Sequence, residues 1–303
     1  MANDPFGLKG RTAVITGAGG GLGRTHALLF AKHGANVVVN DLGGKFDGTG
    51  KGSEMADQVV TEIKAAGGNA VANYDSVSTE AGAAGIVKSA VDAFGRIDIL
   101  VNNAGILRDK SFVNMTDADW DVVFAVHVKG SYYCTKAAWP LMREQKYGRV
   151  VLTSSASGIY GNFGQTNYSA AKMGLVGLGQ TLALEGDKYN IRVNIIAPVA
   201  ASRMTESLMP PNILEKLKPE CVSPLVVYLC SEGIDVNGEV YEVGAGAVSR
   251  IEWVRSKGLA MDPDQINVES VAAAWAQIND MSDAKITRLI GESTQATLAH
   301  CLG

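Results

Sequence analysis

Short apolar runs alternate with amphipathic segments along the first 250 residues of the chain. The runs are rich in Val and Ile, and they are continuous rather than alternating, which is typical of parallel strands buried on both faces. We expect strands at TAVITG (12–17), NVVVND (36–41), NAVANYD (69–75), IDILVNNAG (97–105), GRVVLTSS (148–155), IRVNIIAP (191–198) and GEVYEVGAG (238–246).

The segments between these runs have helical periodicity, as in LGRTHALLFAKHG and GSEMADQVVTEIKAAGG. Strands separated by helices require right-handed crossovers, which produce a parallel sheet with helices on both faces. The sequence therefore predicts a doubly wound α/β fold with three α/β/α layers over residues 1–250. After about residue 250 the alternation stops, and NVESVAAAWAQIND and a stretch from Asp283 to about His300 predict helices. We interpret residues 251–303 as a helical extension of the same domain, because some fifty residues are few for an independent core.

One connection is unusually long. GGKFDGTGKGS (43–53) follows the second predicted strand and is richer in glycine than an ordinary strand-to-helix loop. Ligands of doubly wound sheets bind outside the carboxyl ends of the strands. We therefore expect a flexible loop beside the ligand site.

Composition narrows the classes of function. The formal net charge is -4 and 47% of the residues are hydrophobic, which argues against nucleic acid or an anionic membrane as a partner. No signal-peptide core or bilayer-length apolar run is present, so we expect a soluble intracellular protein. The four cysteines and four histidines show no metal-ligand spacing, and we expect no metal.

The first predicted strand runs directly into TGAGGGLG, which contains Gly17, Gly21 and Gly23. Glycines between a strand and a helix let the backbone approach a pyrophosphate, whose charge then lies at the helix N-terminus. Asp41 ends the second strand, where a carboxylate binds the adenine ribose hydroxyls and repels a 2′-phosphate. The alternative for Asp41 is a solvent-facing strand end, but no basic residue directly follows it. NAD is favoured over NADP.

Two further strand ends carry candidate cofactor contacts. Asp75 is placed to meet the adenine, or it is only a turn residue. NNAG at 102–105 includes Asn103, Ala104 and Gly105 and can brace the neighbouring backbone beside the cofactor, although the same letters fit a plain Asx turn.

A proton-transfer group is predicted near the middle of the chain. Ser155 ends a buried strand, and Tyr168 and Lys172 are four residues apart on one helical face. An ammonium about 4 Å from a phenolate, at an effective dielectric near 20, contributes about 4 kcal/mol, or roughly three pKa units. That would bring the tyrosine pKa to about 7, where general acid–base catalysis works best. Ser155 would hold the substrate oxygen against the phenol.

The glycine turn, NNAG and Ser155 with YSAAK together resemble the short-chain dehydrogenase/reductase family over about residues 8 to 250. This resemblance implies a Rossmann fold and reversible oxidation of a secondary alcohol. It makes Tyr168 the acid–base, Lys172 a ligand of the nicotinamide ribose, and Pro198 a neighbour of the nicotinamide amide. The implied cofactor-binding set is Gly17, Gly21, Leu22, Gly23, Asp41, Asp75, Ser76, Asn103, Ala104, Gly105, Tyr168, Lys172 and Pro198.

Two positions depart from the family pattern. Pro198 is followed by Val where the family usually has Gly. The central helix reads VHVKG, so His127 stands where many members have an asparagine that completes a proton relay. Either the relay is lost, or His127 performs it, since imidazole both donates and accepts hydrogen bonds. We favour the second interpretation and include His127 among the catalytic residues.

VVVNDLGG, NYDSV, NNAGILRD, ASGIYGNFGQTNYSAAK and SRMTESLMP resemble a narrower group, the (3R)-hydroxyacyl-CoA dehydrogenase units of peroxisomal multifunctional enzymes type 2, or 17β-hydroxysteroid dehydrogenases type 4. The implied reaction converts a (3R)-3-hydroxyacyl-CoA thioester and NAD⁺ into 3-oxoacyl-CoA and NADH. The alternatives are a hydroxysteroid dehydrogenase, a 3-oxoacyl-carrier-protein reductase and, more remotely, an inactive NAD-binding sensor. The resemblance also implies a homodimer or homotetramer, in the cytoplasm if free-standing and in the peroxisomal matrix if part of a multifunctional enzyme.

Overall fold

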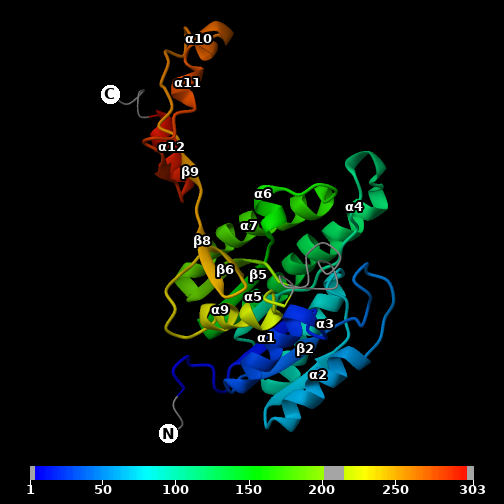
Figure 1. Ribbon diagram of the computed structural model, residues 1–303. Coiled ribbons are helices and arrows are strands. Elements are labelled where there is room, and N and C mark those ends of the chain that lie inside the picture. The colour runs from blue at the N-terminus through cyan, green and yellow to red at the C-terminus, as the bar shows by residue number, and fades with distance from the viewer. Residues whose placement is uncertain (1–3, 201–214, 299–303) are drawn as a thin grey trace. The chain divides into compact units, whose positions relative to one another are not determined.

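An eight-stranded sheet forms the centre of the computed structural model, which describes residues 4–200 and 215–298 (Figure 1). The strand order is β3-β2-β1-β4-β5-β6-β7-β8, and each neighbouring pair from β3 to β7 is parallel. The doubly wound prediction is confirmed. The strands are β1 (Thr12–Thr16), β2 (Asn36–Asn40), β3 (Asn69–Asn73), β4 (Ile99–Asn102), β5 (Gly148–Thr153), β6 (Ile191–Pro198), β7 (Val240–Gly244) and β8 (Ala247–Ile251).

Helices cover both faces of this sheet. One layer contains α1, α2 and α9, in which α1 contacts the other two, and the other contains α3, α5 and α7. The helices of residues 4–250 that the structure describes are α1 (Gly21–Lys32), α2 (Glu54–Ala65), α3 (Glu80–Phe94), α4 (Asp117–Phe124), α5 (Gly130–Gln145), α6 (Ala156–Tyr160), α7 (Thr166–Gly186) and α9 (Ser223–Leu229), with a π-helical turn at Ala125–Lys129 and 3-10 turns at Phe112–Asn114, Asp187–Tyr189 and Pro219–Cys221. No helix of the described residues is long and apolar enough to cross a bilayer.

The eighth strand is the difference from the seven that the apolar runs predict. β8 follows β7 after a turn in which Ala245 and Gly246 have φ of 49° and 83°. Four of its five residues are exposed. It therefore lacks the buried run by which the other seven strands are recognised in the sequence.

Strand order places the candidate site. The chain moves from β1 outward to β2 and β3 and then returns to β4 on the other side of β1. At such a reversal the loops after β1 and β4 diverge, leaving a crevice outside the carboxyl ends of the strands. The glycine turn follows β1, and NNAG closes β4, so both line this crevice.

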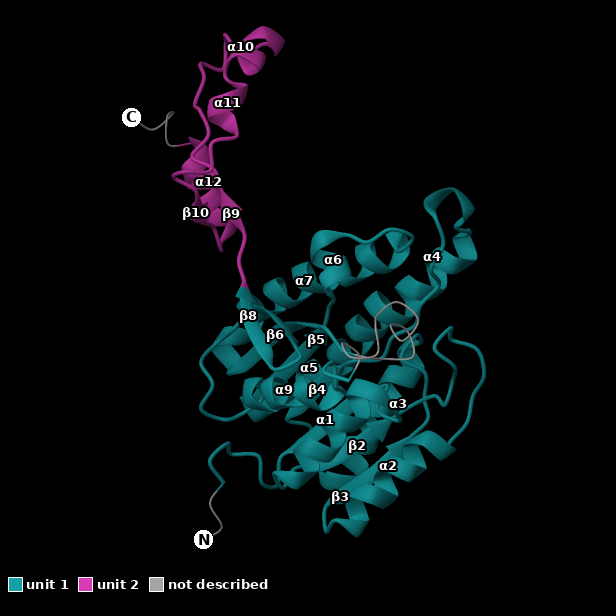
Figure 2. Ribbon diagram, in the orientation of Figure 1, with its two compact units in different colours: residues 1–250 teal, residues 251–303 magenta. Residues whose placement is uncertain are grey.

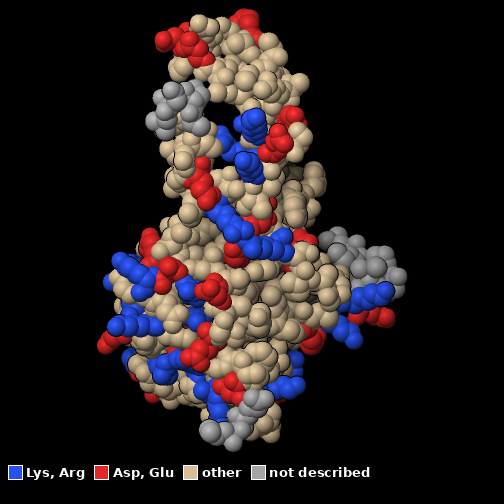
Figure 3. Space-filling model, turned by 90° about the vertical axis from the view of Figure 1, so that its left-hand side faces the viewer, with Lys and Arg blue, Asp and Glu red and all other residues tan. Residues whose placement is uncertain are grey.

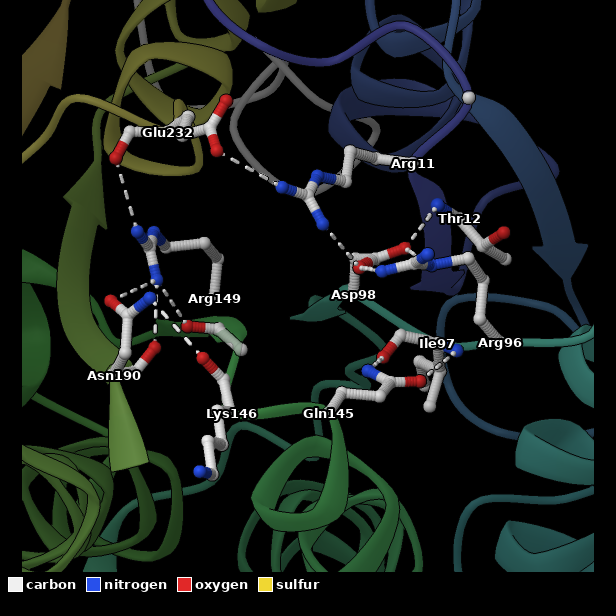
Figure 4. A network of polar contacts seen from close by, with 12 residues as sticks. Arg11, Thr12, Arg96, Ile97, Asp98, Gln145, Lys146, Arg149, Asn190 and Glu232 are labelled. Atoms are coloured by element: carbon white, nitrogen blue, oxygen red, sulfur yellow. Dashed lines mark hydrogen bonds and ion pairs between the residues drawn. The ribbon is translucent and has the colours of Figure 1, made fainter. Parts of the chain in front are cut away.

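A buried polar network lies at the opposite ends of the strands, their amino ends (Figure 4). The carboxylate of Asp98 is fully buried and accepts hydrogen bonds from Arg11, Arg96 and the amide of Thr12, at 2.7–3.1 Å. Arg149 is 2% exposed and donates to four backbone carbonyls. The bonds of Asp98 tie the amino ends of β1 and β4 together, and those of Arg149 tie β5 to the residue before β6, away from the crevice.

The chain divides into two compact units, residues 1–250 and 251–303 (Figure 2). The described part of the second unit contains α10 (Val268–Ala273), α11 (Trp275–Ile278) and α12 (Ile290–Leu298), with the antiparallel strands β9 (Val254–Arg255) and β10 (Lys285–Ile286). Helices are thus present as expected, but α12 begins at Ile290 rather than Asp283, because β10 occupies part of that stretch. That this unit extends the first domain stays a prediction.

Charged side chains of both signs are interspersed on the face drawn in Figure 3. That face has no extended basic field of the kind that binds nucleic acid, in keeping with the net charge of -4.

Candidate active site

Two glycines of the turn, Gly17 and Gly23, are packed too closely for other residues. Gly17 has a φ of 63°, and a Cβ there would lie 2.9 Å from the Cα of Ala104. A Cβ on Gly23 would lie 2.1 Å from the carbonyl oxygen of Gly17. Gly21 opens α1 with a φ of 50°, and a Cβ there would meet no atom within 4 Å. The first turn of α1 therefore presents its amides at an open position, which fits a pyrophosphate.

Asp41 lies directly beside this turn. Its two carboxylate oxygens accept hydrogen bonds from the amides of Gly19, at 2.8 Å, and Gly43, at 2.7 Å. Leu22, in the first turn of α1, packs against the main hydrophobic core. The structure thus brings the carboxylate and the glycine turn together as a dinucleotide site requires, and the chain fits NAD at this end.

The end of β4 is joined to the end of β1. The side-chain amide of Asn103 donates to the carbonyls of Thr16 and Gly17, at 2.9 and 3.1 Å. The amides of Asn103 and Ala104 both donate to the hydroxyl of Thr16, at 3.0 Å. NNAG is therefore a brace for the glycine turn, as proposed from the sequence. Thr16 completes that brace, although its place in an apolar run predicts only a strand residue.

The remaining predicted cofactor contacts lie at other strand ends. Asp75 follows β3 and accepts a hydrogen bond from Asn73 at 2.9 Å. Ser76 is half-buried and bonds Ser78 at 2.8 Å. Pro198 is the last residue of β6 and pairs with Val243 of β7. Residues 201–214, which include all of SRMTESLMP, lie outside the described residues.

Ser155 is positioned by a short helix. It follows β5, adopts an extended backbone and caps α6, its hydroxyl accepting a hydrogen bond from the amide of Ser157 at 3.1 Å. A Cβ on Gly158 would lie 2.8 Å from the Cβ of Lys172. This close packing of α6 on α7 holds the serine next to the helix that carries Tyr168.

Tyr168 and Lys172 share one face of α7, as predicted. The ammonium nitrogen of Lys172 lies 5.4 Å from the centroid of the Tyr168 ring and donates to the carbonyl of Thr153 at 2.5 Å. Lys172 is 3% exposed. The structure therefore brings Ser155, Tyr168 and Lys172 together at the carboxyl end of β5.

The pKa values of this group differ from the expectation. Burial raises the pKa of Tyr168 to about 12, opposed by a hydrogen bond from Ser155 and reinforced by the charge of Asp109. Burial also lowers the pKa of Lys172 to about 7. Lys172 is thus largely uncharged above neutral pH, and desolvation of the phenolate dominates the pKa of Tyr168. The prediction of a tyrosine pKa near 7 is therefore wrong.

His127 lies behind the tyrosine. It stands in the π-helical turn Ala125–Lys129, and its ring meets that of Tyr168 edge-on with centroids 5.3 Å apart. Its Nε2 lies 2.9 Å from the carbonyl oxygen and 3.1 Å from the amide nitrogen of Ile106. Burial, and then the charge of Lys172, hold its pKa well below the usual value, so the ring is neutral. Its buried Nδ1 has no hydrogen-bond partner among the residues that the structure describes.

Gly105 is required by this histidine. A Cβ on Gly105 would lie 2.6 Å from Cε1 of His127. The glycine of NNAG therefore leaves room for the imidazole, in addition to any room it leaves for a cofactor.

Two polar residues that the motifs do not single out hold the loop after β4. Gln165 donates to Asp109 at 2.7 Å. Asn167, fully buried, donates to the carbonyl of Arg108 at 3.1 Å and accepts from the amide of Tyr168 at 2.7 Å. Their position next to Tyr168 could have identified these residues from the sequence, because the Q-T-N-Y run places three polar side chains at the start of a helix. They connect the catalytic helix to the loop that follows NNAG.

Comparison with known proteins identifies the class. A family model of short chain dehydrogenases matches residues 11–212, and the chain belongs to that family of oxidoreductases. A short-chain type dehydrogenase/reductase of Mycobacterium tuberculosis is 58% identical over 280 residues, which are 92% of this chain and 98% of that protein.

The more particular similarity is to peroxisomal multifunctional enzymes type 2. The enzyme of Mus musculus is 55% identical over 292 residues, which are 96% of this chain but 39% of that enzyme. The solved full-length enzyme of Drosophila melanogaster superposes with a TM-score of 0.82 at 45% identity, covering 97% of this chain and 49% of that one. This chain therefore spans less than half the length of these two relatives.

A second solved structure bears on the cofactor. A 7α-hydroxysteroid dehydrogenase in complex with NADH and 7-oxo glycochenodeoxycholic acid superposes with a TM-score of 0.73 at 30% identity, covering 81% of this chain and 98% of that one. NAD(H) is a typical cofactor of the family. Both family resemblances stated from the sequence are confirmed.

Proposed function

We propose that this chain oxidises (3R)-3-hydroxyacyl-CoA thioesters to 3-oxoacyl-CoA with NAD⁺. The observation that carries the proposal is the grouping of Tyr168 with Ser155 and Lys172. The group lies at the carboxyl ends of the strands, where the glycine turn also lies. The acyl-CoA substrate and its (R) configuration are supported by the similarity to multifunctional enzymes type 2.

The chemistry of the chain follows from these positions. Ser155 holds the substrate hydroxyl, and Tyr168, as the phenolate, takes its proton while the carbon loses a hydride. NAD⁺, when bound, supplies the hydride acceptor and a positive charge that favours the phenolate. Lys172 binds the adjoining ribose and, when protonated, acts in the same direction.

His127 is the proposed continuation of the proton path. A neutral imidazole carries one donor and one acceptor nitrogen. Nε2 is held by Ile106, while Nδ1 has no partner among the described residues, so Nδ1 is the ring nitrogen left to hold or accept a proton. We keep the relay role for His127 on this ground.

A substrate panel tests the reaction. Purified protein is supplied with NAD⁺ or NADP⁺ and with (3R)- or (3S)-3-hydroxybutyryl-CoA, a 3-hydroxyacyl carrier-protein thioester, or a steroid alcohol. NADH formation from the (3R) CoA thioester alone supports the proposal. Preference for the carrier-protein thioester with NADP⁺, or for the steroid, supports the corresponding reductase or steroid enzyme. Binding of NADH without turnover of any alcohol supports the sensor.

Replacing Asp41 with Ala is expected to raise the Kd for NADH about tenfold and to narrow the preference over NADPH. The carboxylate both binds ribose hydroxyls and repels a 2′-phosphate, and its removal also frees the amides of Gly19 and Gly43. Fluorescence titration with both reduced cofactors measures the ratio.

Asp41→Asn is the matched variant, because it keeps one acceptor oxygen for the turn and removes the charge. It should relax the discrimination against NADPH while retaining most of the fold stability of the parent. An unchanged NADH-to-NADPH affinity ratio in both variants contradicts the role of Asp41.

We also propose that two copies of the chain associate through α5 and α7. These helices border a surface groove of about 260 Å³, lined by Tyr132, Thr135, Lys136, Trp139, Pro140, Leu178, Leu182 and Glu185. Nearby apolar side chains are exposed, with Leu184 at 64%. A homodimer, or a homotetramer built from it, would bury them. The molar mass in solution measures the oligomeric state directly.

The proposed compartment is the cytoplasm for a free-standing chain and the peroxisomal matrix within a multifunctional enzyme.

A further inference from the structure

The long connection between β2 and α2 is an ordered loop that we call the strap (residues 43–52). Its two ends touch: the amide of Gly52 donates to the carbonyl of Leu42 at 3.0 Å, and a Cβ on Gly43 would lie 2.1 Å from the carbonyl oxygen of Gly52. Within the strap, the amide of Lys45 donates to the carbonyl of Thr49 at 2.7 Å. The strap therefore has a closed neck and its own hydrogen bonds, and it differs from the flexible loop that its glycines predict.

The tip of the strap reaches the loop after β4. The amide of Leu107 donates to the carbonyl of Phe46 at 3.0 Å, and a Cβ on Gly48 would lie 3.2 Å from Cδ1 of Ile106. Hydrogen bonds from Thr49 lower the pKa of Asp47, and the charge of Arg108 lowers it further. Because β1 lies between β2 and β4 in the sheet, the strap crosses over the end of β1.

The base of the strap is equally fixed. Asp41 joins it to the glycine turn through the amides of Gly19 and Gly43. A Cβ on Gly19 would lie 2.7 Å from the Cβ of Met55, at the start of α2. The region between Asp41 and Gly105, where the adenosine half of a dinucleotide binds, thus has the strap along its outer side.

The loop that receives the tip also supports the catalytic wall. Ile106 bonds His127 through its backbone, and it belongs to the hydrophobic cluster that packs against Tyr168. Ile106 and Leu107 are therefore held by the strap on one side and by the residues behind Tyr168 on the other.

We propose that the strap is a cofactor-binding element that encloses the adenosine half of NAD(H) and, through Leu107, links its occupancy to the loop behind the catalytic tyrosine. The proposal rests on the proposed function only in taking a nicotinamide dinucleotide as the ligand. The glycines of the strap are explained by the close neck and by the positive φ of Gly43, Gly48 and Gly50.

Excising residues 45–49, with Gly44 joined to Gly50, removes the tip and leaves the neck. Gly44 and Gly50 are already close, since a Cβ on Gly44 would lie 3.2 Å from the carbonyl oxygen of Gly50. We expect stopped-flow fluorescence to show NADH dissociating at least ten times faster than from the parent chain. We also expect NADH to slow amide hydrogen exchange of residues 104–111 in the parent and not in the excised protein.

Two point variants test whether a faster rate comes from loss of the tip contact or from a general change in charge. Gly48→Val pushes the tip away from Ile106 and should shift the dissociation rate in the same direction, which keeps the test valid if the excised protein does not fold. Lys64→Ala removes an exposed charge outside the strap, so its rate should stay within about twofold of the parent. The proposal is overturned if the rates of the tip variants match the parent, if Lys64→Ala reproduces their effect, or if exchange of 104–111 slows equally in the excised protein. All readouts use NADH alone, so failure to oxidise 3-hydroxyacyl-CoA sinks the proposed reaction without touching this test.

Discussion

Replacing Tyr168 with Phe is expected to lower kcat/KM for the hydroxyacyl thioester about a thousandfold, with NADH affinity nearly unchanged. A positioned acid–base group contributes on the order of 10² to 10⁴ in rate, and only the phenol oxygen of Tyr168 is removed. The ring itself, which packs edge-on against His127, is retained. Steady-state kinetics and NADH fluorescence titration give the two numbers.

Tyr160→Phe is the matched control, because this tyrosine is 69% exposed at the end of α6. It should leave both measurements within about twofold of the parent. Retention of more than a tenth of the activity by Tyr168→Phe would remove the phenol from the mechanism, while the assignment to the dehydrogenase family would stand.

Replacing Lys172 with Met is expected to abolish most activity and yet to stabilise the protein below neutral pH. Burial lowers the pKa of Lys172 from 10.5 to about 7, so protonating it in the fold is costly. Each pKa unit corresponds to about 1.4 kcal/mol. After about 1 kcal/mol is lost with the hydrogen bond to Thr153, a gain of about 3 to 4 kcal/mol in the free energy of unfolding is expected at pH 6.

The gain should depend on pH in a definite direction. Between pH 7 and 10.5 the unfolded lysine binds a proton that the folded one has lost, so the stability of the parent rises with pH. The advantage of Lys172→Met therefore shrinks through this window, and above it the parent is the more stable by the hydrogen bond to Thr153, about 1 kcal/mol. Denaturant unfolding at pH 6, 8 and 10 measures it, with the exposed Lys64→Met as control. A constant difference between parent and variant across these pH values contradicts the burial argument.

The fold prediction rests on the pattern of apolar residues along the chain. Seven strands were predicted because each is a continuous apolar run whose burial the parallel sheet requires, as in Ile99–Asn102, where all four residues are buried. Glycine spacing located the turn after β1 for a steric reason that the contacts of Gly17 and Gly23 now give. Strand β8 was not predicted because four of its five residues are exposed and need no apolar pattern.

The pattern of residue types did not predict the pKa values in the site. Spacing places Lys172 one turn after Tyr168, but it does not say that both groups are buried, and burial reverses the expected direction of the tyrosine pKa. Contacts made through the backbone are also invisible in residue types. The bond between Phe46 and Leu107, and that between Ile106 and His127, involve main-chain atoms that any residue provides.

The buried network around Asp98 and Arg149 separates two tasks in one sheet. The strands are aligned at their amino ends, so the strap at their carboxyl ends can vary in length and composition without unfolding the sheet. Transplanting the strap segment from a relative is therefore a practical route to altered nucleotide retention in this chain, whereas changes at Asp98 would endanger folding itself.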